Sequence, residues 1–360
     1  MTVASISRAK ELYDGTAHIV GQEKARRSLA VLLERQHFVA MDLLDRSYGA
    51  IVAGRTGTGK TYLAKTMAKL SGLPFADVNA TQFTDKGYVG ADLAQMFVPL
   101  LQDAARILDE ARGHKVVPHG FAGYEEVEPA ARVLQRDDLG DVVELAERGV
   151  VLLDEFDKWM IQGQDVQGRN VGRKLQAELL KMVEGDTEYV SDDEDELGTP
   201  IDTSKILVIC CGAFVGLPAM VLRRLQRDEE YMNDEGFWSL IEPADFVRYG
   251  VLPELAGRLP YHIFMTPLRE EHLAGIMRQK GGIVEEYRGR FNALGIEWEV
   301  PDVALQHLAY IALSKEMGAR AVEHVMAMTF ADALFEASVA RRPMIVRYEV
   351  GRSKAWLEAA

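Results

Sequence analysis

The chain has 360 residues, and its 41 lysines and arginines against 55 aspartates and glutamates give a formal net charge of −14 at pH 7. Its 48% hydrophobic and 27% charged residues argue against wholesale disorder, and a chain of this size can form a hydrophobic core without disulfides or structural metals. The two cysteines, Cys210 and Cys211, are adjacent, which excludes a disulfide framework or a four-cysteine zinc site, and the acidic balance argues against duplex DNA as a first partner.

We expect neither a membrane-spanning helix nor a secretory signal peptide. No run of about 18 uncharged apolar residues occurs, and the N-terminal MTVASISRAKELYDG is charged too early to hold the apolar centre of a signal peptide. We therefore expect a cytoplasmic protein. At about 100–200 residues per domain, the length predicts two or three domains.

The hydrophobic pattern predicts helices that alternate with buried strands. Residues 1–45 have a helical pattern with a break at Gly21 and Gln22. Continuous apolar runs then predict strands over 49–53, 74–78, 149–153 and 206–210, and a helix is expected over 60–70. This alternation indicates an α/β fold, a mostly parallel sheet flanked by helices. Beyond Pro267 the pattern is mainly helical up to a strand over 344–350, so we expect a large domain over 1–267 and a smaller one over 268–360.

Two stretches look like insertions. Residues 112–138 carry proline, glycine and charges without clear periodicity. Residues 185–200 contain five consecutive acids, 192–196, and are expected to form a solvated, mobile loop.

The strongest signal is GRTGTGKT, from Gly54 to Thr61, which fully matches G-x-x-x-x-G-K-[ST] between an apolar strand and a helix. Glycines let backbone N–H groups surround phosphate oxygens, and the positive end of the following helix adds to the field. Lys60 is expected to reach the β- and γ-phosphates, and the Thr61 hydroxyl to join a Mg²⁺ shell. The alternative is a chance glycine-rich turn. We expect ATP to be bound by Gly54, Thr56, Gly57, Thr58, Gly59, Lys60, Thr61 and Tyr62.

A second apolar run, over 150–155, ends in Asp154 and Glu155. A strand end would bring Asp154 beside the phosphate loop as a Mg²⁺ ligand and Glu155 to a water in line with the γ-phosphate. An ordinary solvated strand end is the alternative. The second acid favours ATP hydrolysis over transfer of the phosphoryl group to a bound acceptor.

In this order, the motifs resemble the ClpX/HslU branch of the AAA+ protein unfoldases, whose fold is a P-loop ATPase domain followed by a small lid domain. The resemblance covers nearly the whole chain, and the tyrosine-bearing loop and the Gly257–Pro260 segment are specific to that branch. In addition to the phosphate loop, the matching segments are Ile19–Gln22, Gly87–Gly90, Leu153–Lys158, Leu179–Gly185, Ile201–Leu207, Gly212–Phe214, Pro253–Pro260 and Gly318–Arg320.

The resemblance implies roles outside the phosphate loop. Ile19 and Val20 would line the adenine pocket. The alternative for either residue is an ordinary position in the hydrophobic core. Arg258 would be a catalytic finger offered to the γ-phosphate of the neighbouring subunit, since a guanidinium can hold two oxygens as charge develops. Arg320 would be a second sensor of the nucleotide. The alternative for each arginine is an ordinary surface residue. An arginine finger that acts in trans requires an oligomer. The family implies a homo-oligomeric ring, which is expected to be a hexamer.

Tyr88 and Val89 would line the axial channel of such a ring. There, aromatic and branched side chains pack against unfolded chains of any sequence, mainly by apolar burial. A buried tyrosine in a turn is the alternative for Tyr88. The segment 168–174 corresponds to a second channel loop, one residue shorter than usual, and its basic residues either touch substrate or begin a solvated helix.

The chain departs from the family in its expected docking elements. The N-terminal four-cysteine zinc domain of ClpX is absent from this sequence, so substrate recognition is expected to involve the ring, the insert at 112–138 or an adaptor. Only Gly236-Phe237, in a shortened stretch, resembles the tripeptide by which ClpX docks its peptidase, and the end of the chain does not resemble the HslU tail.

Two further positions depart from the family pattern. The acidic run at 192–196 stands where ClpX has a basic loop at the channel entrance, and six copies would add on the order of 30 negative charges there. We expect preference for basic peptide ends, and equal translocation of basic-tailed and acidic-tailed substrates would contradict it. Where many AAA+ proteins have a first sensor, this chain has Cys210 and Cys211, expected to be buried small hydrophobes.

The leading interpretation is an ATP-dependent, ring-forming protein unfoldase that threads substrate proteins through its channel, without a peptidase. The alternatives are the ATPase subunit of a two-component protease, a nucleic-acid motor, and a slow ATP-gated assembly scaffold. The net charge and the aromatic channel loop argue against the motor.

Overall fold

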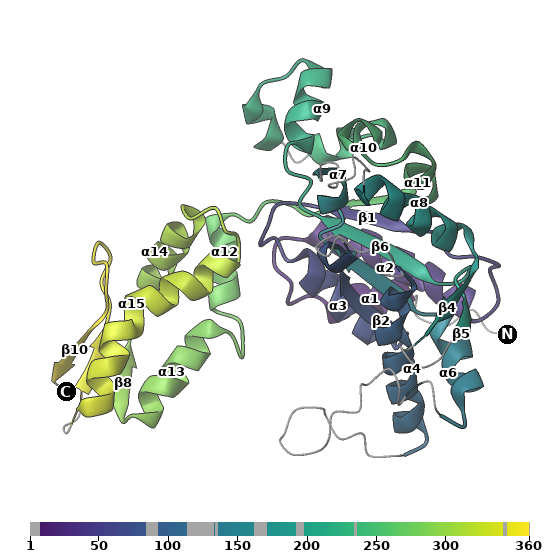
Figure 1. Cartoon of the computed structure of the whole chain (residues 1–360). Helices are drawn as coiled ribbons and strands as arrows, with labels where there is room; N and C mark the ends of the chain where they lie inside the picture. Colours follow the sequence, from purple (N-terminus) through teal and green to yellow (C-terminus); the bar gives the residue numbers. More distant parts are fainter. Residues whose placement is uncertain are drawn as a thin grey trace. The chain divides into compact units, whose positions relative to one another are not determined.

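A computed structural model of the chain describes residues 8–83, 93–113, 133, 136–161, 171–191, 198–233, 236–340 and 344–359 (Figure 1). These form two compact units. The first comprises Met1–Thr16, Lys24–Gly54 and Lys60–Phe264, and the second Ala17–Glu23, Arg55–Gly59 and Met265–Ala360. Two short N-terminal segments therefore belong with the C-terminal part of the chain. The domain limits 1–267 and 268–360 stay a prediction.

The first unit is built on a five-stranded parallel sheet. Its order is β2 (Phe75–Asn79), β3 (Val150–Asp154), β6 (Leu207–Gly212), β1 (Ala50–Ala53), β7 (Tyr261–Phe264), and every neighbouring pair is parallel. β1 and β6 bury every residue and β3 all but its last, because the sheet is covered on both faces. Four of the strands were predicted to within two residues. The edge strand β7 was not, since it is short and only one of its four side chains is fully buried.

Helices cover both sides of this sheet (Figure 1), which confirms the predicted α/β class. The helices of the first unit are α1 (Arg8–Gly15), α2 (Glu23–Ala40), α3 (Lys60–Ser71), α4 (Val98–Ala111), α6 (Leu139–Ala146), α7 (Lys158–Ile161), α8 (Val171–Glu184), α9 (Leu217–Leu225), α10 (Pro243–Tyr249) and α11 (Pro253–Arg258). Short 3-10 helices span Ala80–Phe83, Leu93–Phe97, Glu229–Asn233 and Phe237–Leu240. Among the described helices, none is both long and apolar enough to cross a membrane.

The stretch 185–200, expected to be a loop, contains an antiparallel hairpin instead. β4 (Thr187–Val190) pairs with β5 (Thr199–Asp202). The hairpin forms because the residues on either side of the acidic run alternate between buried and exposed, with Val190 and Ile201 fully buried. The acidic residues between the two strands lie outside the described residues.

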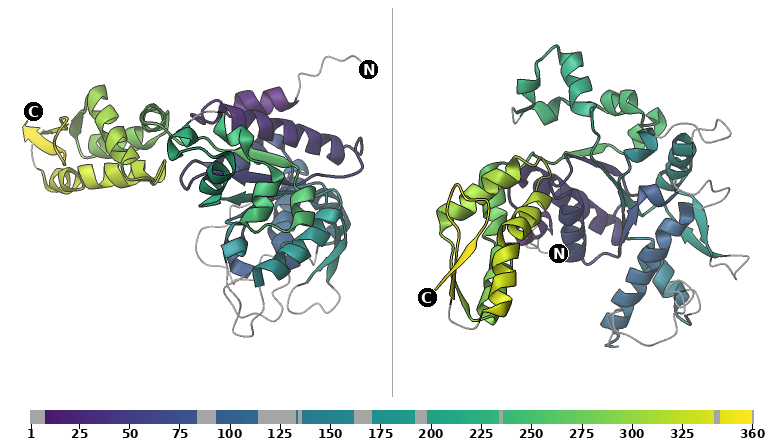
Figure 2. Two further views of the ribbon diagram at one scale, coloured as in Figure 1. Left: turned by 90° about the horizontal axis from the view of Figure 1, so that it is seen from above. Right: turned by 60° about the vertical axis from the view of Figure 1, so that its left-hand side comes forward.

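The second unit packs helices against a three-stranded sheet (Figure 2). The helices are α12 (Glu270–Met277), α13 (Ile283–Ala293), α14 (Asp302–Leu313) and α15 (Arg320–Val339). In the sheet, β9 (Met344–Arg347) lies parallel to β8 (Ile296–Glu299) and antiparallel to β10 (Trp356–Ala359). The predicted strand over 344–350 corresponds to β9, while β8 and β10 were not predicted. Phe291, Phe330 and Val346 lie at the centre of this unit's core.

Candidate functional site

Asp154, at the carboxyl end of β3, organises the part of the site in the first unit. Its Oδ2 accepts a hydrogen bond from the Thr61 hydroxyl at 2.6 Å, and its Oδ1 accepts one from the Glu155 backbone N–H at 2.8 Å. Both carboxylate oxygens therefore have defined partners. Because Thr61 is the second residue of α3, this hydrogen bond ties the phosphate loop's helix to the end of β3.

Glu155 has a left-handed backbone, with φ +57°, which is uncommon for a residue with a side chain. Such a conformation costs about 1–2 kcal/mol and persists only where the surroundings impose it. Here the next residue, Phe156, is fully buried and its N–H donates to the Cys211 carbonyl at 2.8 Å. The turn thus buries Phe156 while the Glu155 side chain stays exposed beside Asp154.

Lys60 begins α3, and its ammonium donates to the Gly54 carbonyl at 2.7 Å. Gly54 itself is held by its N–H, which donates to the Gly212 carbonyl at the end of β6 at 3.3 Å. The Lys60 ammonium therefore lies within the turn that the motif predicts. One end of that turn continues into α3, and the other is fixed by the hydrogen bond to the end of β6.

The middle of the phosphate loop, residues 55–59, belongs to the second unit. Gly57 and Gly59 have φ +76° and +90°, which explains glycine at both positions. The Ala319 N–H donates to the Gly57 carbonyl at 2.8 Å. The backbones cross so closely that a Cβ on Gly57 would lie 2.0 Å from the Met317 carbonyl oxygen, and one on Gly318 2.5 Å from the Gly57 oxygen.

The other predicted nucleotide contacts differ in burial. Ile19 is 6% exposed, Val20 is half-buried with its methyl groups facing Gly275, and Tyr62 is exposed on α3. Thr56 is exposed within the loop, whereas Thr58 is buried. Arg320 is exposed as the first residue of α15. The adenine and sensor roles of these residues stay predictions.

Arg258 ends α11 with its guanidinium held by Glu184, the last residue of α8. The Glu184 Oε1 accepts from an Arg258 terminal nitrogen at 2.8 Å and from Nε at 3.1 Å. Both side chains are nearly half exposed, at 45% and 44%. The role of Glu184 was not predicted, because it stands 74 positions from Arg258 and no local sequence pattern links the two residues.

Several predicted features fall wholly or partly outside the described residues. Tyr88 and Val89 lie outside them, as does most of the insert at 112–138. At the base of the insert, Arg136 bridges Asp109 and Asp138. Of the second channel loop, residues 171–174 are described, and Arg173 and Lys174 are exposed on α8.

Cys210 and Cys211 are free and fully buried in β6, as predicted. Burial raises the pKa of both thiols, so they stay protonated and unreactive near neutral pH. They act as small apolar residues at the centre of the sheet.

Phe237, which resembles part of a peptidase-docking tripeptide, is a core residue. It is fully buried, with its ring centroid 5.3 Å from that of Trp238 and 6.5 Å from that of Tyr231. A side chain packed in this way is unavailable for docking on a partner's surface.

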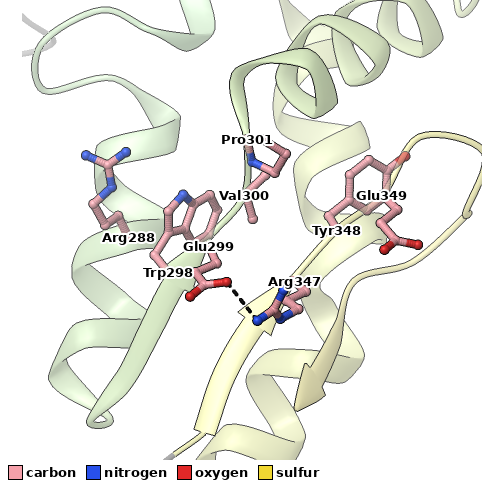
Figure 3. A pocket seen from close by; sticks show the side chains of 8 residues that line it. All are labelled: Arg288, Trp298, Glu299, Val300, Pro301, Arg347, Tyr348 and Glu349. Carbon is pink, nitrogen blue, oxygen red and sulfur yellow. Dashed lines mark ion pairs between the residues drawn. The ribbon is translucent and has the colours of Figure 1, made fainter. Parts of the chain in front are cut away.

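A separate pocket of about 440 Å³ lies in the second unit along β8 and β9 (Figure 3). Arg347, one of the lining residues, pairs with Glu299 at 2.9 Å and with Glu358 at 2.7 Å, and Glu349 adds another negative charge. This balance does not suit a triphosphate. The residues that line the pocket are Arg288, Trp298, Glu299, Val300, Pro301, Arg347, Tyr348 and Glu349.

Comparison with known proteins agrees with this arrangement. Residues 50–233, half of the chain, match the ATPase family associated with various cellular activities (AAA), and residues 268–344 match the C-terminal, D2-small domain of ClpB protein. The ATP-dependent Clp protease ATP-binding subunit ClpX of Treponema denticola is 29% identical over 346 residues, 89% of this chain and 74% of the relative. ClpX of Porphyromonas gingivalis is 29% identical over 365 residues (94% and 79%), and ClpX 2 of Wolinella succinogenes is 30% identical over 347 (89% and 75%). The chain therefore belongs to the AAA family of ATP hydrolases and is a ClpX-type member of it.

Proposed function

We propose that the chain forms a homo-oligomeric ring that uses ATP hydrolysis to unfold or remodel proteins by drawing them through an axial channel. The observation that carries this proposal is the bond between Thr61 and Asp154 at the end of β3, beside the exposed carboxylate of Glu155. The similarity to ClpX over 89% of the chain supports the unfoldase class. Threading itself rests on the resemblance at Tyr88 and Val89.

The residues at the end of β3 fit a nucleotide bound with Mg²⁺. The Thr61 hydroxyl and the Asp154 carboxylate bring two oxygen donors within 2.6 Å of each other, the ligand type that Mg²⁺ takes. When bound, Mg²⁺ supplies neutralisation of the charge on the β- and γ-phosphates. Lys60 would bind phosphate oxygens from within the loop.

Glu155 is the general base in this proposal. Its backbone N–H is fixed by Asp154, and its exposed side chain can accept a proton from the attacking water. A carboxylate beside the metal ligand suits water as the nucleophile and therefore favours hydrolysis.

Arg258 would complete the site of a neighbouring subunit. Its pairing with Glu184 holds the guanidinium at an exposed position at the end of α11, from which a second copy of the chain could receive it. An always-charged, planar group suits the charge that develops on the γ-phosphoryl group. Hydrolysis would then require the assembled ring, in which a hexamer is expected.

The relatives are named as ATP-binding subunits of the Clp protease, so an ATPase subunit of a two-component protease is the second candidate. We favour a remodeller that works without a peptidase, because Phe237 is fully buried. Degradation of an unfolded test protein by the chain mixed with a ClpP-type peptidase would reverse this preference.

The decisive experiment uses the Glu155→Gln variant, which should bind ATP and retain substrate. Purification with ATP should recover protein substrates, and the same purification with ADP should not. Tyr88→Ala should lose remodelling of an unfolded test protein while keeping basal ATP hydrolysis. Unchanged remodelling by Tyr88→Ala would indicate a scaffold, and stimulation of hydrolysis by nucleic acid but not by unfolded protein would indicate a nucleic-acid motor.

A further inference from the structure

Gln22, which precedes α2, has a fully bonded and buried side-chain amide. Its Nε2 donates to the Thr266 carbonyl at 2.8 Å and to the Thr58 carbonyl at 3.3 Å, and its Oε1 accepts from the Thr266 N–H at 2.9 Å. The residue is 1% exposed. One side chain thus joins a backbone group of the phosphate loop to both backbone groups of Thr266.

The reciprocal bonds to Thr266 fix which way the amide points. If the oxygen and nitrogen of Gln22 were exchanged, two donors would face each other at the Thr266 N–H and two acceptors at its carbonyl. The remaining hydrogen on Nε2 is therefore the one directed at the Thr58 carbonyl. Thr58 lies between Gly57 and Gly59, the two glycines with positive φ.

The direction of the Thr58 carbonyl determines that of the next N–H. The described peptide bonds are trans, and in a trans peptide the carbonyl of one residue and the N–H of the next point in opposite directions. Because the Thr58 carbonyl points at Gln22, the Gly59 N–H points away from it. Since Gly59 is flexible at φ +90°, this peptide plane needs an external restraint to hold one orientation.

We propose that Gln22 is a positioning residue for phosphate binding: it aims the Gly59 N–H at the nucleotide phosphates and ties that peptide plane to Thr266. This proposal rests on the nucleotide site proposed above. Gln22, Thr58 and Thr266 all belong to the second unit, so the same amide holds together the three chain segments that make up that unit.

A matched pair of substitutions separates positioning from stability. Gln22→Met keeps length and neutrality but removes all three hydrogen bonds. Gln36 is the control, because it is also 1% exposed and its Nε2 donates to the carbonyls of Arg148, Gly149 and Lys205, away from the phosphate loop. Both variants should lower the temperature of unfolding, since each leaves buried carbonyls unpaired.

The readout is the affinity for a fluorescent ADP analogue, titrated without turnover at a temperature where both variants are folded. Gln22→Met should weaken binding about tenfold or more, whereas Gln36→Met should stay within about twofold of the wild type. Equal affinities in the two variants would overturn the proposal. A wild-type chain that binds no nucleotide would overturn the nucleotide site and this proposal with it.

Hydrogen exchange of the wild-type chain gives a second test that does not depend on folding of a variant. If the amide of Gln22 couples the loop to Thr266, then ADP, by stabilising the loop, must also slow exchange of the Thr266 N–H, because coupling is reciprocal. We expect slowing of about fivefold or more. Unchanged exchange at Thr266 with nucleotide bound would overturn the coupling.

Discussion

Replacing Gly318 with alanine should separate the segment 317–319 from the phosphate loop. An added Cβ would lie 2.5 Å from the Gly57 oxygen, 2.6 Å from its carbonyl carbon and 2.9 Å from its Cα. All three contacts are to backbone, so no side chain can rotate away. The residue also has φ +61°, a conformation that alanine adopts only with strain.

The expected cost of Gly318→Ala is the sum of these two effects. The left-handed backbone costs about 1–2 kcal/mol, and forcing an extra carbon into a packed contact costs about 1–3 kcal/mol, which together give about 2–5 kcal/mol. Gly295→Ala is the matched control, because Gly295 has φ +71° but no described heavy atom within 4 Å of its Cβ position. Its expected cost is the backbone effect alone, about 1–2 kcal/mol.

Chemical unfolding and titration with a fluorescent ADP analogue measure the two consequences. Gly318→Ala should unfold at lower denaturant concentration than Gly295→Ala and bind the nucleotide about tenfold more weakly, since each 1.4 kcal/mol lost from binding is a factor of ten. Gly295→Ala should bind like the wild type. Equal stability and equal affinity in the two variants would show that the close crossing of Gly57 and Gly318 has no energetic consequence.

Two further predictions concern catalysis and pH. Arg258→Ala should lower kcat for ATP hydrolysis about 10³-fold, as expected for loss of an arginine finger. Glu184→Gln should lower kcat at most about fivefold, because an exposed ion pair contributes only about 0–1 kcal/mol. Equal losses of kcat in the two variants would contradict this. Burial lowers the pKa of His262 below its usual 6.5, so as pH falls the unfolded chain takes up a proton first, and stability present above about pH 6.5 is lost below it. His262→Phe keeps an aromatic ring against Phe246 and should flatten this loss in unfolding curves between about pH 7 and 5; an unchanged slope would assign the pH dependence to other groups.

The predictable parts of the fold are those with a strong local signal. β1, β3 and β6 are buried on both faces, and their continuous apolar runs identified them. β8 and β10 are strands of only four residues. β8 alternates apolar and acidic residues, a strand pattern that was not recognised, whereas β10 has no such alternation. Both strands pair with β9, which contributes to their formation.

The same distinction applies to the site. The phosphate loop and the acids at 154–155 are contiguous motifs, so they were predicted from their residues and from the strands and helices expected next to them. Gln22 contacts Thr266 across 244 positions. Neither the break before a helix nor the family match over Ile19–Gln22 indicated this contact. The left-handed turn at Glu155 also has no signature, because it is imposed by the burial of Phe156.

The central claim is that Asp154 and Glu155 have different roles in ATP hydrolysis: Asp154 is a Mg²⁺ ligand, and Glu155 acts only as the base for the attacking water. The most direct test measures ATP binding and phosphate release for Glu155→Gln beside the wild type. We expect ATP affinity within about threefold of the wild type and a kcat lowered by about 10²-fold or more. Phosphate release at the wild-type rate, or loss of ATP binding, would contradict it.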